Sequence, residues 1–120
     1  PAEIRASVAA VRRMSPGRIG VIFQPHTYSR TKLLMEDFVK ALRPVENLMV
    51  YKTYPAREYF DAEGSAKTLA QNVGNCLYAE SIRELKTWLK TTLQPGDVVL
   101  FLGAGDIYYA AQYLLKELNK

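Results

Sequence analysis

The chain's only histidine lies in a segment suited to binding a small amine or anion. This segment, Gln24 to Arg30, has the sequence QPHTYSR and follows a short apolar run. An imidazole can orient an amine or accept its proton near neutral pH, and a guanidinium offers a planar fork that matches a carboxylate. His26 and Arg30 are therefore the first candidates for a site. The alternative is that His26 is an ordinary turn residue and Arg30 a solvated helix residue, because most loop residues have no chemical role.

A second candidate segment, YPAREYFD, begins at Tyr54 and places Arg57 beside Glu58 between aromatic residues. Two interpretations fit this composition, the rim of a substrate site and a packed surface loop. We favour the packed loop, because ion pairs on protein surfaces are common and contribute little to stability.

The third candidate, GAGD from Gly103 to Asp106, invites comparison with the dinucleotide-binding pattern G-x-G-x-x-G. Tyr108 stands where the third glycine belongs. The acidic residue that binds the ribose should follow about 20 residues later, but only 12 residues follow Tyr108. The segment is therefore better interpreted as a tight turn with Asp106 as the N-cap of the next helix, in which Gly103 and Gly105 bring the backbone close to a ligand.

Other classes of site are excluded by what the sequence lacks. It contains neither the phosphate-binding pattern G-x-x-x-x-G-K-[ST] nor the nucleophile pattern G-x-S-x-G. A single Cys and a single His provide neither a disulfide nor the usual zinc ligands. We therefore expect no metal site and no catalytic cycle carried out by this chain alone.

Composition and charge are those of an ordinary globular protein. Of the 120 residues, 48% are hydrophobic and 23% are charged, and the formal net charge is +4. This balance permits an anionic ligand, but the basic residues are scattered, so we expect no nucleic-acid partner. The apolar runs are far shorter than the roughly 20 residues needed to cross a bilayer. We expect no membrane partner and a cytoplasmic location.

Hydrophobic periodicity predicts the elements that must position these segments. Short apolar runs bounded by turn residues indicate buried strands at 18–24, 47–54, 77–78 and 98–102. Helical spacing of apolar residues predicts helices at 3–14, at 29–43 with Ser29 as N-cap, at 66–74, from 82 onward behind a capping box at Ser81, and at 107–118.

The alternation of helices and strands predicts one α/β domain. We expect a Rossmann-like three-layer arrangement, with a mostly parallel sheet and helices on both faces. In such sheets ligands bind beyond the carboxyl ends of the strands. The three candidate segments each follow a predicted strand, so they should meet at that edge.

The same segments carry a family resemblance. FQPHTYSRT from Phe23, YPARE from Tyr54 and GAGDI from Gly103 resemble, in order and spacing, the C-terminal domain of the Mur ligase family. The first block is similar to the branch that adds L-alanine to UDP-N-acetylmuramate. The resemblance implies that residues 1–120 form one C-terminal domain, as a fragment of a three-domain enzyme. The other domains would bind the UDP-sugar and, through a P-loop, ATP.

The resemblance also implies a reaction and a set of roles. With Mg²⁺, ATP would phosphorylate the muramoyl carboxylate, and the amine of L-alanine would displace the phosphate. ATP and Mg²⁺ would be bound mainly outside this chain, and the isolated domain would be inactive. Arg30 would bind the alanine carboxylate, and His26 would act as the catalytic residue near the amine. Thr27, which stands where many relatives have a second arginine, would contribute its hydroxyl to the binding of L-alanine.

The rim of this site would comprise residues of the second and third segments: Tyr54, Arg57, Glu58, Gly103, Gly105 and Asp106. The alternative is a stand-alone Rossmann-like binding module for a small anionic metabolite or a protein partner, without catalysis.

Overall fold

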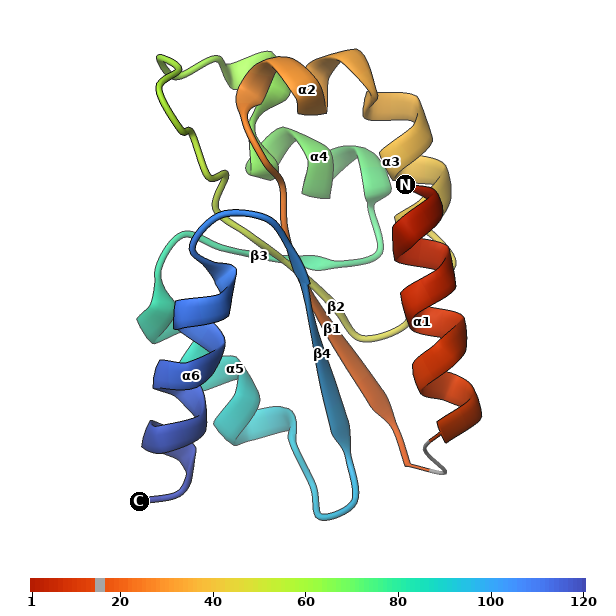
Figure 1. Ribbon diagram of the computed structural model, residues 1–120, viewed down its shortest axis with the longest axis vertical. Coiled ribbons are helices and arrows are strands. Elements are labelled where there is room, and N and C mark those ends of the chain that lie inside the picture. The colour runs from red at the N-terminus through yellow and green to blue at the C-terminus, as the bar shows by residue number, and fades with distance from the viewer. Residues whose placement is uncertain (15–16) are drawn as a thin grey trace.

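A four-stranded parallel sheet forms the centre of the computed structural model, which describes residues 1–14 and 17–120 (Figure 1). The strands are β1 (Ile19–Gln24), β2 (Leu48–Tyr51), β3 (Leu77–Ala79) and β4 (Val98–Gly103), and their order in the sheet is β3-β2-β1-β4. The chain thus builds outward from β1 to β3 and then returns to the other side of β1. This reversal places the topological switch point between the carboxyl ends of β1 and β4.

Helices cover both faces of the sheet (Figure 1). On one face lie α1 (Ala2–Met14), α3 (Met35–Leu42) and α4 (Ala66–Val73), and on the other lie α5 (Ile82–Thr92) and α6 (Ile107–Leu118). Each face of the sheet has its own hydrophobic core, and successive strand residues point alternately into the two. Val21 and Phe23 pack in the core under α1, α3 and α4, and Ile22 packs in the core under α5 and α6. The predicted three-layer α/β fold is confirmed.

One predicted helix is in fact two. The expected helix at 29–43 is divided into α2 (Tyr28–Leu33) and α3, with Leu34 between them at φ −106° and ψ 20°. The break has a packing reason. It lets α2 lie against the short 3₁₀ helix η1 (Ala62–Gly64), while α3 turns its apolar side, including the buried Phe38 and Leu42, toward the sheet.

The second strand is shorter than the predicted 47–54, because regular pairing ends at Tyr51. Pairing resumes as an isolated parallel bridge between His26 and Tyr54. The strand prediction therefore merged a true strand with a separate contact between two of the candidate segments.

In the part of the chain that the structure describes, every helix is too short or too polar to span a membrane.

Candidate functional site

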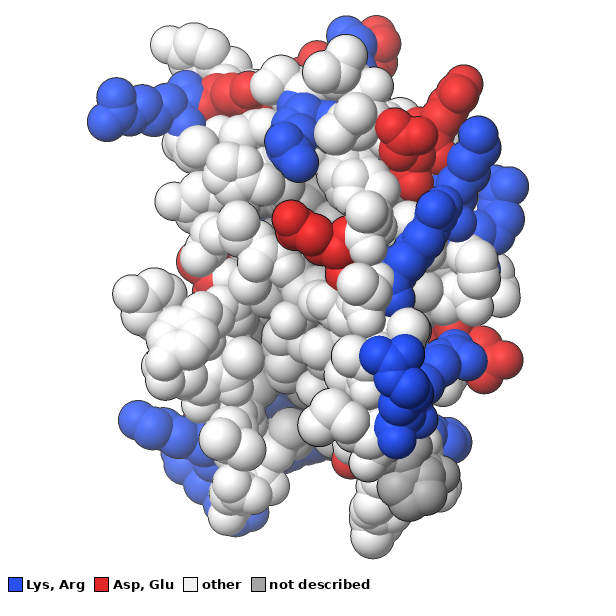
Figure 2. Space-filling view, turned by 45° about the vertical axis from the view of Figure 1, so that its right-hand side comes forward, with Lys and Arg blue, Asp and Glu red and all other residues white. Residues whose placement is uncertain are grey.

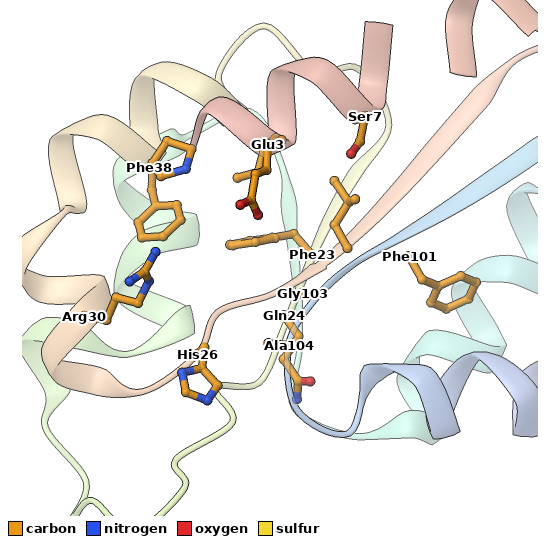
Figure 3. A pocket seen from close by; sticks show the side chains of 13 residues that line it. Glu3, Ser7, Phe23, Gln24, His26, Arg30, Phe38, Phe101, Gly103 and Ala104 are labelled. Carbon is orange, nitrogen blue, oxygen red and sulfur yellow. The ribbon is translucent and has the colours of Figure 1, made fainter. Parts of the chain in front are cut away.

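A cavity of about 330 Å³ opens at the switch point between β1 and β4 (Figure 3). Gln24 and Gly103 line it from the ends of the two strands, and His26 and Arg30 line it from the segment that follows β1. The structure thus brings together the two residues that the sequence singled out first, at the place where open parallel sheets bind ligands.

Charged groups of opposite sign line this cavity. Figure 3 shows Glu3 of α1 and Arg30 of α2 reaching toward it from different elements, with the rings of Phe23 and Phe38 beside them. An acid and a base across a partly apolar cavity are complementary to a small zwitterion. Sequence reasoning missed Glu3, because nothing in the sequence shows that the start of the first helix lies at the carboxyl edge of the sheet.

His26 is held against the second segment. Its ring stacks on that of Tyr54, with centroids 5.5 Å apart and planes at 20°. The backbone pairs on either side, since the N–H of Thr27 donates to the carbonyl of Tyr54 at 2.8 Å and the N–H of Tyr54 donates to that of Pro25 at 2.9 Å. The first two candidate segments therefore form one joined unit.

Thr27, and not Ser29 as predicted, is the N-cap of α2. Its Oγ1 accepts from the N–H of Arg30 at 3.3 Å, and its carbonyl accepts from the Oγ1 of Thr31 at 2.8 Å. Thr27 has φ 58° and ψ 154°, a region that β-branched residues rarely adopt. The predicted position was wrong by two residues because this turn starts the helix earlier than the apolar spacing indicates.

Glu58 occupies the free amides at the start of α2. Its Oε1 accepts from the N–H groups of Tyr28 at 2.7 Å and Ser29 at 3.0 Å, and its Oε2 accepts from the Ser29 hydroxyl. The Ser29 hydroxyl, followed by the Ser29 amide, lowers the pKa of Glu58. The anion that this helix start favours is thus the chain's own carboxylate, while Arg57 is exposed and is not among the described residues lining the cavity.

The third segment closes against the other two. Gly103 has φ 138°, and a Cβ on it would lie 2.5 Å from the carbonyl oxygen of Gln24. Gly105 has φ 113°, and a Cβ there would lie 2.7 Å from Cδ1 of Tyr54. Only glycine fits both the backbone and the space at these two positions.

Asp106 stands at the N-cap position of α6, but its side chain makes no capping hydrogen bond. Its backbone has φ −93° and ψ 8°, outside the extended region from which an N-cap side chain turns back onto the helix. Instead its carbonyl accepts from the N–H groups of Tyr109 and Ala110, both at 3.1 Å. The predicted N-cap position of Asp106 is confirmed, but its carboxylate does not cap the helix by a hydrogen bond.

A second cavity of about 340 Å³ lies beyond the ends of β1 and β2. Lys52, Tyr54 and Asp106 line it, and Gln24 lies between it and the first cavity. Gln24 is 1% exposed, and its Nε2 donates to the carbonyl of Lys52 at 3.1 Å. Its Oε1 has no hydrogen-bond partner among the described residues. The sequence places Gln24 at the end of a predicted strand and at the start of the first candidate segment, but it indicates no role for the Gln24 side chain.

The charges around the site are mixed. Figure 2 shows basic side chains along the right-hand side of the face it presents, with acidic side chains beside them, and a largely uncharged middle. Within residues 1–14 and 17–120, no three His, Cys, Asp or Glu side chains come together as a metal ion would require.

Comparison with known proteins places this geometry in a family. The model described as "Mur ligase, glutamate ligase domain" matches residues 1–105. UDP-N-acetylmuramate--L-alanine ligases from Clostridium tetani and Aquifex aeolicus are 38% and 42% identical to the chain, over 97% and 99% of its length. In both cases the match covers 26% of the relative, so the chain spans about a quarter of the length of these proteins.

A solved structure shares the fold. It is a domain described as part of a UDP-N-acetylmuramate:L-alanyl-gamma-D-glutamyl-diaminopimelate ligase of Haemophilus ducreyi. It superposes with a TM-score of 0.65 at 21% identity, covering 98% of this chain and 83% of that one. The family model, the relatives and the parallel sheet with its site at the switch point agree, and the chain belongs to the Mur ligase family.

Proposed function

We propose that this chain is the amino-acid-binding domain of an ATP-dependent ligase that joins L-alanine to UDP-N-acetylmuramate. Residues 1–120 would form the C-terminal domain of a three-domain enzyme of peptidoglycan precursor synthesis. The observation that carries the proposal is the convergence of His26, Arg30 and Glu3 on one cavity at the switch point. The names of relatives that are 38% and 42% identical to the chain support the choice of substrates.

The cavity suits an α-amino acid. The guanidinium of Arg30 would bind the carboxylate of L-alanine through charge-assisted hydrogen bonds. The ammonium would then face His26 and Glu3. Phe23 and Phe38 provide apolar surface for the methyl group.

The amine must lose a proton before it can attack an acyl group. The imidazole of His26 would accept that proton, the role that positioned histidines most often have in general acid–base catalysis. The nitrogen would then form the amide bond at the muramoyl carbonyl, and phosphate would leave. Holding the amine against the activated carboxyl group is the main contribution that a positioning domain makes to such a rate.

ATP and Mg²⁺ would be bound mainly by parts of the enzyme outside this chain. The phosphate-binding pattern G-x-x-x-x-G-K-[ST] is absent from the 120 residues, and the described residues bring together no cluster of metal ligands. Closure of this domain over the other two would bring the amine to the acyl phosphate.

The proposal is tested with the complete ligase that carries this chain. Phosphate release should require ATP, UDP-N-acetylmuramate and L-alanine together, and the product should contain an amide bond to alanine. Efficient release with D-glutamate in place of L-alanine would contradict the proposal.

A further inference from the structure

We propose that Tyr54 and Gly105 are positioning residues that set the orientation of the His26 ring. Gly105, Tyr54 and His26 come from the segments that follow β4, β2 and β1, and Tyr54 lies next to both of the other two. The catalytic consequence rests on the proposed function, but the placement of the ring does not.

The His26 ring needs an external restraint. Its side chain is only half-buried, so it is not fixed by the packing of a core. The Tyr54 ring lies nearly parallel to it at 5.5 Å between centroids, which is the range of favourable offset stacking. Two backbone hydrogen bonds of 2.8 and 2.9 Å flank the pair and hold the main chains of the two residues side by side, within stacking distance of each other's rings.

Gly105 leaves the space that the Tyr54 ring occupies. A Cβ at position 105 would come within 2.9 Å of the Cβ of Tyr54 and 2.7 Å of its Cδ1. Real Cβ atoms essentially never approach this closely, so any other residue would displace the ring. A side chain at position 105 would therefore change the orientation of the His26 ring by displacing the Tyr54 ring on which it stacks.

The ring of Tyr54, and not its hydroxyl, carries this role. Among the described residues the hydroxyl has no hydrogen-bond partner, whereas the ring stacks on His26 and lies so close to Gly105 that a Cβ there would overlap it. Tyr54→Phe should therefore preserve the orientation of His26, and Tyr54→Leu should lose it.

Nuclear magnetic resonance of the 120-residue chain gives a direct readout, because His26 is its only histidine. With labelled histidine, the imidazole Hδ2 and Hε1 signals report the ring current of Tyr54. We expect these signals to keep their positions in Tyr54→Phe. In Tyr54→Leu they should move toward the positions found in an unfolded peptide. A shift in Tyr54→Phe as large as that in Tyr54→Leu would overturn the proposal.

Gly105→Ala tests the same contact with Tyr54 left in place. We expect it to move the His26 signals in the same direction as Tyr54→Leu. Gly74→Ala is the matched control, because Gly74 has φ 88° and an added Cβ would meet no atom within 4 Å. The control carries a similar backbone strain and should leave His26 unchanged. Unmoved His26 signals in folded Tyr54→Leu and Gly105→Ala would overturn the proposal.

Kinetics of the complete ligase separate this inference from the proposed function. A misplaced catalytic group can cost on the order of 100-fold in rate, so we expect a loss of that order in kcat/KM for L-alanine with Tyr54→Leu and none with Tyr54→Phe. If the His26 signals move in Tyr54→Leu while kcat/KM stays unchanged, the positioning stands and the catalytic role of His26 falls.

Discussion

Thr27 combines an unfavourable backbone conformation with a full set of hydrogen bonds. At φ 58° and ψ 154° it lies close to a region that is essentially reserved for glycine, and such residues cost about 1–3 kcal/mol. Its amide, carbonyl and hydroxyl all bond to neighbours, namely Tyr54, Thr31 and Arg30. The conformation therefore persists because the surrounding contacts hold it, and it turns the chain so that His26 and Arg30 line the same cavity.

Two substitutions separate the cap from the strain. Thr27→Ala removes the capping oxygen and keeps a Cβ, so the free energy of unfolding should fall by about 1 kcal/mol. Thr27→Gly also removes the oxygen but relieves the backbone, so it should be at least as stable as the original chain. Urea unfolding of both variants checks the order. A Thr27→Gly variant that is less stable than Thr27→Ala would show that no strain is stored at this position.

The residues of the site were predictable to different degrees. His26 and Arg30 follow from their chemical types and from their place after a buried strand. The backbone angle of Thr27 and the contact between Gly105 and Tyr54 depend on how three loops meet, which no local pattern encodes. The same limit explains why Glu3 was missed, since its place at the cavity follows from the packing of α1 on the sheet.

At the scale of elements, Glu58 ties the second loop to the start of α2. The sequence suggested a pair between Arg57 and Glu58, because the two are neighbours. In the structure the Glu58 carboxylate instead accepts three hydrogen bonds, from the N–H of Tyr28 and from the N–H and hydroxyl of Ser29. The free amides at a helix N-terminus favour a nearby anion. Here that anion is the Glu58 carboxylate, which lies 30 residues from Tyr28 along the chain.

This capping carboxylate predicts a pH dependence. Hydrogen bonds from Ser29 lower the pKa of Glu58 in the folded chain. A carboxyl group whose pKa is lowered by folding adds stability above its ordinary pKa of about 4.3, and that stability is lost as the pH falls through the folded value. We expect Glu58→Gln to be less stable than the original chain at pH 7, and the difference to shrink toward zero at acidic pH.

Urea unfolding of both chains across this pH range is the measurement. Other carboxylates titrate there too, so only the difference between the two chains reports Glu58. A difference that stays constant from pH 7 to acidic pH would mean that the charge of Glu58 does not cap α2.

The elements themselves were predictable where a pattern is local. Alternating helices and strands gave the three-layer class, and the capping box at Ser81 marks the true start of α5, where Ser81 Oγ accepts from the N–H of Glu84. The break at Leu34 was not predictable, because the apolar spacing continues through it and only the contact of α2 with η1 explains it.

At the scale of the whole molecule, the chain spans about a quarter of the length of its relatives. We expect the gene that encodes it to encode a P-loop of the form G-x-x-x-x-G-K-[ST] before Pro1. We also expect the 120-residue chain to hydrolyse no ATP. Phosphate release assays on the purified chain check this, and robust turnover would contradict the assignment of the nucleotide site to other domains.

Binding of L-alanine distinguishes a closing domain from a free-standing receptor. A domain whose site is completed by others should bind L-alanine only weakly by itself, because it presents one wall of the final site. Isothermal titration of the isolated chain is expected to show dissociation in the millimolar range or weaker, an affinity of about 4 kcal/mol or less. Micromolar binding of one metabolite would favour the stand-alone binding module.

The central claim, that this domain binds the amino acid, is tested most directly at Arg30 in the complete ligase. Hydrogen bonds to charged groups contribute about 1.5–3 kcal/mol, so Arg30→Ala should raise the KM for L-alanine roughly 10- to 100-fold and leave the KM for ATP unchanged. Lys32→Ala is the matched control, because it removes the same charge from α2, where Lys32 pairs with Asp61 and Glu63 instead of lining the cavity. An unchanged KM for L-alanine in Arg30→Ala, or an equal rise in Lys32→Ala, would contradict the account.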